Sequence, residues 1–172
     1  VKISAMNAME TIIQQLDLSP HPEGGYFKET YRSKGTISEA ELGGPYDGKR
    51  NYATSIYFLL HSETFSAFHK IHQDEQWHFY MGATIKLHII DPNGDYSYKN
   101  IGNDLSQGEV PQNTVPGGHW FAAEVAAKDS FALAGCTVAP GFDFRDFQMP
   151  KRAELTKLFP QHTSIIKRLT RE

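Results

Sequence analysis

Short segments rich in β-branched and aromatic residues dominate the chain after residue 25, and they constrain its fold more than any other feature. These segments are YFKETYR, TSIYFLL, TFSAFHKI, EQWHFYM, TIKLHII, TVPGGHWFAA and SFALAGCTV. Clusters of turn-forming residues lie between them, notably HSE, HQD and DPNGD. Many short strands at such spacing are typical of a β-sandwich or β-barrel. The sequence therefore predicts an all-β fold.

Helical periodicity is confined to the two ends of the chain. Apolar residues recur at positions i, i+3, i+4 and i+7 in Met9, Ile12, Ile13 and Leu16. This spacing predicts an N-terminal helix that starts near Asn7. Residues 1–6 are expected to be disordered or to remain from cloning. Residues 153–159 and 163–171 predict short C-terminal helical pieces. The polar, glycine-bearing residues 33–50 predict a mobile loop near a barrel mouth.

The size and charge of the chain limit its partners. A length of 172 residues suits one domain, 1–172, with a single core. A net charge of −3 gives no basic field for a nucleic acid polymer or an anionic membrane. No apolar run approaches the roughly 20 residues that span a bilayer, and Cys136 is the only cysteine, which excludes a disulfide framework. We expect a cytoplasmic protein that binds a small molecule or its own copies.

The stretch FHKIHQDEQWHFYMG, residues 68–82, holds three histidines and two acids within ten residues. Alternate side chains of a strand share a face, so Glu75, Trp77 and Phe79 are predicted to point into the barrel together. A carboxylate in such an interior is costly unless a metal, a cation or hydrogen-bond donors meet it. His69 is the nearest candidate to do so. The alternative is that His69 and Glu75 form an ordinary structural pair.

Several separate motifs carry a family resemblance. The stretches LSPHPEGGYFKETYRS, TSIYFLL, DEQWHFYMG and CTVAPGFDFRDFQM together resemble an uncharacterised single-domain subfamily of the cupin superfamily, domain of unknown function 985. The similarity extends from Leu16 to Pro160. It implies a double-stranded β-helix, the cupin jelly-roll barrel, with an internal pocket that solvent can reach. It also implies a homodimer.

The chain departs from metal-binding cupins at two positions. Those proteins typically hold the metal with three histidines and a glutamate; His69 and Glu75 match, but Ile71 and Phe121 occupy the other two histidine positions. A stable site for a first-row metal normally has three or four ligands. His119 is two residues out of register, about 7 Å along a strand. We expect no cofactor, the alternative being a weakly bound divalent metal at His69, Glu75 and His119.

A histidine and a carboxylate in one pocket suggest proton transfer. The stretch EGGYFKETY is similar to the opening strand of the metal-independent, cupin-fold dTDP-sugar 3,5-epimerases. That resemblance implies His69 as the catalytic base, oriented by Glu75, Asp143 or Asp146. The ligand would then be a nucleotide or sugar derivative. Its predicted binding residues are the nearby cations and rings: Arg32, Arg50, Lys86, Tyr26, Tyr31, Trp77, Phe79 and Phe121.

Three hypotheses of function stay open from the sequence. The first is a metal-independent isomerase or epimerase that acts on a carbonyl or sugar-derived substrate. The second is a cupin that binds a small ligand without turnover. The third is an enzyme that uses a weakly held divalent metal. The first predicts activity that survives a chelator. The second predicts that a ligand shifts the melting curve but that no product forms. The third predicts metal that elemental analysis detects.

Overall fold

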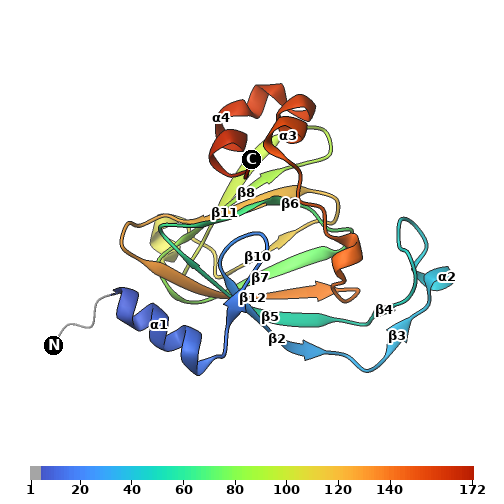
Figure 1. Ribbon diagram of the computed structural model, residues 1–172, viewed down its shortest axis with the longest axis horizontal. Helices are drawn as coiled ribbons and strands as arrows, with labels where there is room; N and C mark the ends of the chain where they lie inside the picture. Colours follow the sequence, from blue (N-terminus) through green and yellow to red (C-terminus); the bar gives the residue numbers. More distant parts are fainter. Residues whose placement is uncertain (1–4) are drawn as a thin grey trace.

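A computed structural model of the protein describes residues 5–172 and contains two large antiparallel β-sheets that face each other, and a third, two-stranded sheet (Figure 1). The larger sheet has the order β1 (Ser19–Pro20), β2 (Tyr26–Arg32), β5 (Thr54–His61), β12 (Phe131–Ala139), β7 (Asp74–Gly82), β10 (Gln112–Val115). The smaller sheet has the order β6 (Phe65–His69), β11 (Trp120–Val125), β8 (Ile85–Ile90), β9 (Tyr96–Ile101). The prediction of an all-β jelly roll is confirmed.

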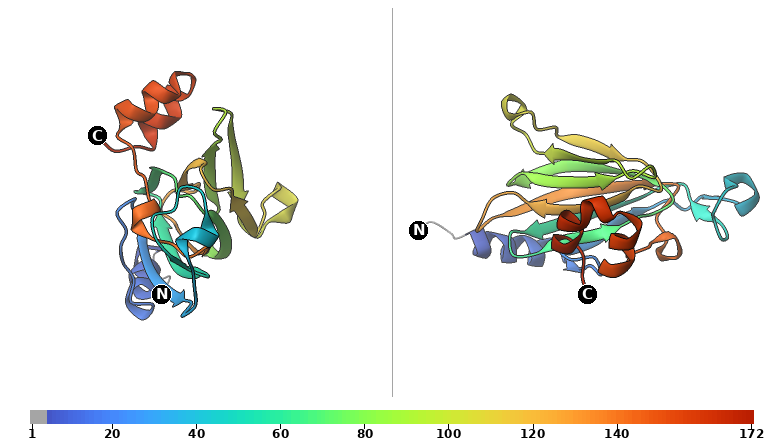
Figure 2. Two further views of the ribbon diagram at one scale, coloured as in Figure 1. Left: turned by 90° about the vertical axis from the view of Figure 1, so that its right-hand side faces the viewer. Right: turned by 90° about the horizontal axis from the view of Figure 1, so that it is seen from above.

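The helices at the two ends of the chain cover the outer faces of the sheets (Figure 2). The helical segments are α1 (Ala5–Gln15), α2 (Glu39–Leu42), α3 (Arg152–Leu158) and α4 (Thr163–Arg168), with the 3-10 turns η1 (Leu105–Gln107), η2 (Phe144–Asp146) and η3 (Pro160–His162). The predicted terminal helices are therefore confirmed. Within residues 5–172, every helix is too short or too polar to cross a membrane.

Three details differ from the predictions. Residues 1–4 of the segment predicted to be disordered lie outside the described part of the chain, whereas residues 5 and 6 already belong to α1. The predicted loop 33–50 contains β3 (Thr36–Ile37), α2 and the first residue of β4 (Arg50–Asn51). The Ser38 side chain and Glu41 form a capping box that starts α2. Strand β9 was not predicted because four of its six residues are exposed and its sequence, YSYKNI, is polar.

The strands bury side chains on both faces, which explains their continuous apolar runs. In β5, Phe58 and Leu60 point into the core between the sheets, while Leu59 packs on its other side against α1. Strand β11 repeats this pattern: Phe121 points inward and Trp120 packs outward under α3 and α4. The two outer clusters thus hold the terminal helices against the sheets, and the inner cluster forms the core between the sheets.

Candidate functional site

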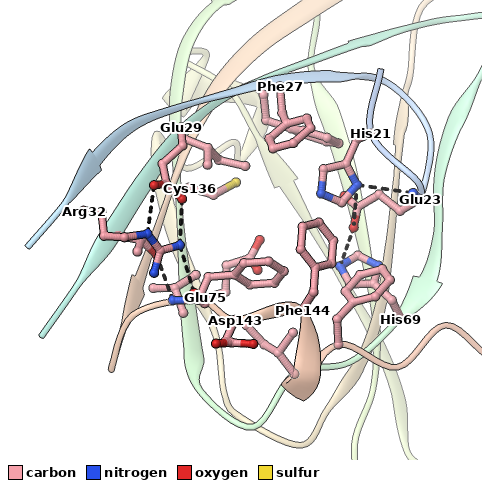
Figure 3. A pocket seen from close by; sticks show the side chains of 17 residues that line it. His21, Glu23, Phe27, Glu29, Arg32, His69, Glu75, Cys136, Asp143 and Phe144 are labelled. Atoms are coloured by element: carbon pink, nitrogen blue, oxygen red, sulfur yellow. Dashed lines mark hydrogen bonds and ion pairs between the residues drawn. The ribbon is translucent and has the colours of Figure 1, made fainter. Parts of the chain in front are cut away.

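One end of the space between the sheets contains a cavity of about 280 Å³ (Figure 3). Its walls come from the turn before β2, from β2, β5, β6, β7 and β12, and from the segment around η2. Seventeen residues line it: His21, Glu23, Phe27, Glu29, Arg32, Thr54, Ile56, Phe58, His69, Ile71, Glu75, Cys136, Val138, Phe142, Asp143, Phe144 and Phe147. The volume is close to the lower limit for pockets that bind small organic molecules. His69 and Glu75 share this cavity, as the strand pattern predicts.

The residue that meets His69 is Glu23. The Glu23 carboxylate lies 3.0 Å from His69 Nε2, and the two side chains are 8% and 2% exposed. On the other side of the ring, His69 Nδ1 lies 2.7 Å from the carbonyl oxygen of Ala67. A carbonyl oxygen can only accept a hydrogen bond, so Nδ1 carries a proton. Glu75, Asp143 and Asp146 were the predicted partners of His69, but Glu23 occupies this position instead.

Glu23 and His69 form a buried ion pair. Burial alone would raise the pKa of Glu23, but the charge and hydrogen bond of His69, with smaller contributions from His21 and Ser66, lower it below its ordinary value. Burial alone would lower the pKa of His69, but the neighbouring Glu23 carboxylate raises it. His69 is therefore an imidazolium at neutral pH with both ring nitrogens engaged. In this state it has no free lone pair with which to take a proton.

A glycine turn holds Glu23 against β6. Gly24 and Gly25 both have positive φ angles, +113° and +77°. The Glu23 carbonyl accepts a hydrogen bond from the Ala67 amide at 2.8 Å, and the Ser66 hydroxyl donates to the Glu23 carboxylate at 2.9 Å. The turn therefore fixes the backbone and the carboxylate of Glu23 to the strand that carries His69.

Gly24→Ala is expected to destabilise the fold by about 2–5 kcal/mol, because a left-handed backbone costs a Cβ-bearing residue about 1–2 kcal/mol and overpacking costs about 1–3 kcal/mol. A Cβ on Gly24 would lie 2.1 Å from the carbonyl oxygen of Phe65. Gly108→Ala is the matched control, since Gly108 has φ +75° but open space around its Cβ position. Urea unfolding measures both. Equal losses in the two variants would contradict the close approach of the turn to β6.

Glu75 is the carboxyl of the pocket that has no direct ionic partner. It is 8% exposed, and among residues 5–172 no cationic group lies within ion-pair distance of it. Burial raises its pKa to about 7; the Glu23 carboxylate also raises it, while the His69 imidazolium and the nearby Cys136 and Trp77 side chains lower it. At neutral pH the Glu75 carboxyl is thus close to half ionised. It can both accept and release a proton.

Arg32 lines the opposite side of the pocket with its charge already balanced. Its Nε and Nη2 donate to the two carboxylate oxygens of Glu29 at 2.9 and 2.8 Å, and its Nη1 donates to Asn51 at 2.8 Å. Nη2 also donates to the Phe142 carbonyl at 3.1 Å. Asp143 lies nearby, and its hydrogen bonds from Arg145 lower its pKa to about 2. Arg32 and Asp143 are therefore pocket residues, as predicted, but both are already paired.

Arg50 and Asp146 lie outside the pocket and bind each other. Arg50 Nε and Nη2 lie 2.7 and 2.6 Å from the two Asp146 oxygens, and both side chains are almost completely buried. Gln73 donates a further hydrogen bond to Asp146 at 2.7 Å. With both oxygens held in this way, Asp146 does not orient His69. The prediction that Arg50 faces a ligand is corrected for the same reason.

The remaining predicted binding residues lie behind or away from the pocket wall. Phe121 packs under His69, with ring centroids 4.1 Å apart, and Trp77 packs against Phe58 at 5.6 Å. Lys86 lies over the ring of Tyr98, on β8 and β9. Phe79 packs against the core and lines a separate, open surface depression. These positions do not line the cavity.

The alternation along β2 separates the rings that line the pocket from those that do not. Phe27 and Glu29 point into the cavity, whereas Tyr26 points out and packs beside α1. A bulge between Glu29 and Tyr31 shifts the register, so that Arg32 returns to the pocket side and Tyr31 is 54% exposed. The period of two could have identified Phe27 and Glu29. It could not have identified His21 or Glu23, which lie on a turn.

The donor set does not fit the metal that cupins of other families hold. Ile71 lines the pocket at one histidine position, and Phe121 occupies another. His119 contacts the Gly117 carbonyl at 3.3 Å in a turn and is not part of the cavity wall. Both nitrogens of His69 already have partners. Across residues 5–172, no three potential ligand side chains are grouped as a metal site requires.

Known proteins resemble this chain over most of its length. Residues 10–150 match the family described as Cupin superfamily (DUF985), Cupin_5. The uncharacterized protein YML079W of Saccharomyces cerevisiae is 33% identical over 152 residues, which cover 81% of this chain and 74% of the yeast protein.

Two solved structures have the same fold. A hypothetical protein from Leishmania major has a TM-score of 0.87 and 36% identity, with coverage of 95% of this chain and 98% of that one. Protein SO0799 from Shewanella oneidensis has a TM-score of 0.84 and 35% identity, with coverage of 94% and 96%. The resemblance seen in the sequence is confirmed: this chain belongs to the DUF985 (Cupin_5) family of the cupin superfamily.

Proposed function

We propose that this cupin binds a small carbonyl compound in the barrel pocket and transfers a proton at the carbon next to the carbonyl, without a metal, as an isomerase or epimerase does. Glu75 is the base in this proposal. Its carboxylate takes the proton from carbon, and the electron pair of the broken C–H bond moves toward the carbonyl oxygen to form an enolate. A water molecule then gives a proton to the opposite face of that carbon, and Glu75 releases its own proton to solvent.

The observation that carries the proposal is the position of Glu75: its carboxyl is buried on the cavity wall and has no ion-pair partner among residues 5–172. A general base works best when its pKa lies near the operating pH, and burial raises the pKa of Glu75 to about 7. Strongly shifted carboxyls in clefts are candidates for catalytic groups. The Glu75 carboxyl also lies on the cavity wall, where Val138 is its cross-strand neighbour on β12. Both features support a role in proton transfer.

The His69–Glu23 pair has a supporting part in this scheme. His69 is an imidazolium whose two N–H groups are both used, so it contributes its charge rather than a proton. A fixed positive charge beside the site stabilises the negative charge that develops on an enolate oxygen. This assignment moves the role of base, which the sequence assigned to His69, to Glu75.

The proposal predicts hydrogen exchange without knowledge of the product. A panel of small ketones and aldehydes is incubated with the protein in D₂O, and proton NMR follows deuterium uptake at the carbon next to the carbonyl. The rate is expected to rise with pH through about 7 as Glu75 loses its proton. Glu75→Gln should lower the rate by about 100-fold or more, the usual contribution of a general base.

Two controls accompany this exchange experiment. Glu10→Gln changes an exposed carboxyl on α1, far from the pocket lining, and should leave the rate unchanged. Treatment with a chelator should also leave it unchanged, because the proposed step uses no metal. Exchange that persists in Glu75→Gln, or that disappears with the chelator, would contradict the proposal.

Binding without turnover is the second candidate function. It is favoured by one observation: the histidine that would be the obvious base has no free nitrogen. A carbonyl compound that raises the melting temperature of the protein in a Glu75-dependent manner, but undergoes no exchange, would support this candidate over the first.

A further inference from the structure

We propose that the ligand of the pocket is a small organic cation, with its positively charged nitrogen beside Glu75 and its apolar part against the phenylalanine rings. This inference rests on the proposed function only in using the same pocket and the same carboxylate. It narrows the substrate of the proposed reaction to a carbonyl compound with a protonated nitrogen close to the exchanging carbon. It also disfavours the phosphate-bearing ligands that the sequence suggested.

The first support is the charge of the cavity wall. Four carboxyl groups line it, namely Glu23, Glu29, Glu75 and Asp143. Two cations do, His69 and Arg32, while burial lowers the pKa of the third basic side chain, His21, and favours its neutral form. Each of these cations is already in direct contact with a carboxylate, at 3.0 Å for His69 and 2.8 Å for Arg32. Asp143 is balanced by Arg145, which lies outside the lining, so within residues 5–172 Glu75 is the one carboxyl of the four without an ionic partner. An anionic ligand would therefore meet no unpaired cation of the wall and would face the charge of Glu75.

The second support is the unpaired state of Glu75. Its carboxylate is more than nine-tenths buried and lies on the cavity wall without an ion-pair partner among the described residues. A buried carboxylate is costly unless a cation or hydrogen-bond donors meet it, and the neighbouring Cys136 thiol is a weak donor that brings no positive charge. A ligand that brings a protonated nitrogen to this position removes that cost, and a neutral ligand removes less of it.

The third support is the aromatic wall. Phe27 and Phe144 lie on opposite sides of the cavity, between the Glu29–Arg32 pair and the His21–Glu23–His69 group (Figure 3). Phe144 packs edge-on against Phe142 and Phe147, with ring centroids 4.9 and 5.9 Å away. The faces of aromatic rings attract cations and also bury apolar groups. This wall suits an alkyl or aryl amine better than a sugar or a phosphate.

A charge series of one shape tests the proposal. Benzylammonium, benzyl alcohol and benzoate have similar sizes and carry charges of about +1, 0 and −1 at pH 8. Binding of each to the wild-type protein is measured by thermal shift and by ligand-observed NMR. We expect benzylammonium to bind at least tenfold more tightly than benzyl alcohol, and benzoate to bind more weakly than both.

Two variants locate the effect. Glu75→Gln should lower the affinity for benzylammonium at least tenfold, to that of benzyl alcohol, whereas Glu10→Gln, on the exposed face of α1, should have no effect. Glu29→Gln frees Arg32 from its carboxylate partner. This variant should therefore increase the affinity for benzoate severalfold.

Three results would overturn the proposal. In the first, benzoate binds as tightly as benzylammonium. In the second, the Glu75→Gln variant still binds benzylammonium tenfold more tightly than benzyl alcohol. In the third, benzylammonium does not bind at millimolar concentration. The preference for the cation is independent of turnover. A tenfold preference that depends on Glu75, together with no deuterium exchange, would support the ligand class and contradict the proposed proton transfer.

Discussion

Asp146→Ala is expected to lower the free energy of unfolding by about 3–5 kcal/mol, the usual cost of removing one partner from a buried ion pair. The Asp146 carboxylate accepts hydrogen bonds from Arg50 at 2.6 and 2.7 Å and from Gln73 at 2.7 Å. The side chain of Arg50 is 1% exposed, so in the variant its charge is left buried without a counter-charge. Three backbone carbonyls still accept hydrogen bonds from Arg50 Nη1, but they cannot neutralise that charge.

Asp143→Ala is the matched control for this loss. Asp143 also pairs with an arginine through two oxygens, Arg145 at 2.9 and 3.0 Å, but the two side chains are 31% and 48% exposed. Exposed pairs contribute about 1 kcal/mol or less. Urea unfolding of both variants compares the pairs directly. A loss in Asp146→Ala no larger than that in Asp143→Ala would contradict a buried Arg50–Asp146 pair.

Glu75→Gln is expected to make the protein more stable at alkaline pH. The folded pKa of Glu75, about 7, is raised above its ordinary value of 4.5. A carboxyl shifted in this direction stabilises the fold below pH 4.5, and that contribution is lost as the pH rises through about 7. The shift corresponds to about 3 kcal/mol in total. The stability of wild type relative to Glu75→Gln should therefore fall by about 2–3 kcal/mol between pH 5 and 8.

Unfolding by urea at several pH values measures this difference. The groups that face Glu75 are His69, Glu23 and Cys136, and all three are present in both proteins. At pH 8 the variant should melt roughly 5–10 °C above the wild type, since each kcal/mol corresponds to a few degrees at this size. Parallel pH profiles for the two proteins would mean that Glu75 is not shifted. Glu10→Gln should have the pH profile of the wild type.

The sequence predicted which faces of the strands form the pocket, because the period of two is a property of the strand itself. It placed His69 and Glu75 together, and both line the cavity. It did not predict whether an inward-facing side chain borders the cavity or packs in the core. Trp77 shares the inward face with Glu75, but it is 1% exposed and packs in the core against Phe58.

Contacts between distant segments could not be predicted from one sequence. Arg50 and Asp146 are 96 positions apart, so nothing local indicates that the arginine is neutralised within the protein. Glu23 lies on a turn, where no periodicity fixes the direction of a side chain, and it meets His69 only because the turn packs on β6. Both cases changed the assignment of charge in the pocket. The contact between Glu23 and His69 moves the proposed role of base to Glu75, and the pairing of Arg50 with Asp146 removes a cation that the sequence had assigned to the ligand.

The most direct test of this account is the titration of Glu75 itself. Carbon NMR of protein labelled at the glutamate carboxyls, with Glu75→Gln and Glu23→Gln used for assignment, follows each group with pH. The account predicts that the Glu75 carboxyl titrates at about pH 7, whereas Glu23, held by the His69 imidazolium, titrates below its ordinary pKa. A Glu75 carboxyl that titrates near 4.5 would contradict the account, because the carboxyl would then be ordinary and unsuited to exchange a proton at neutral pH.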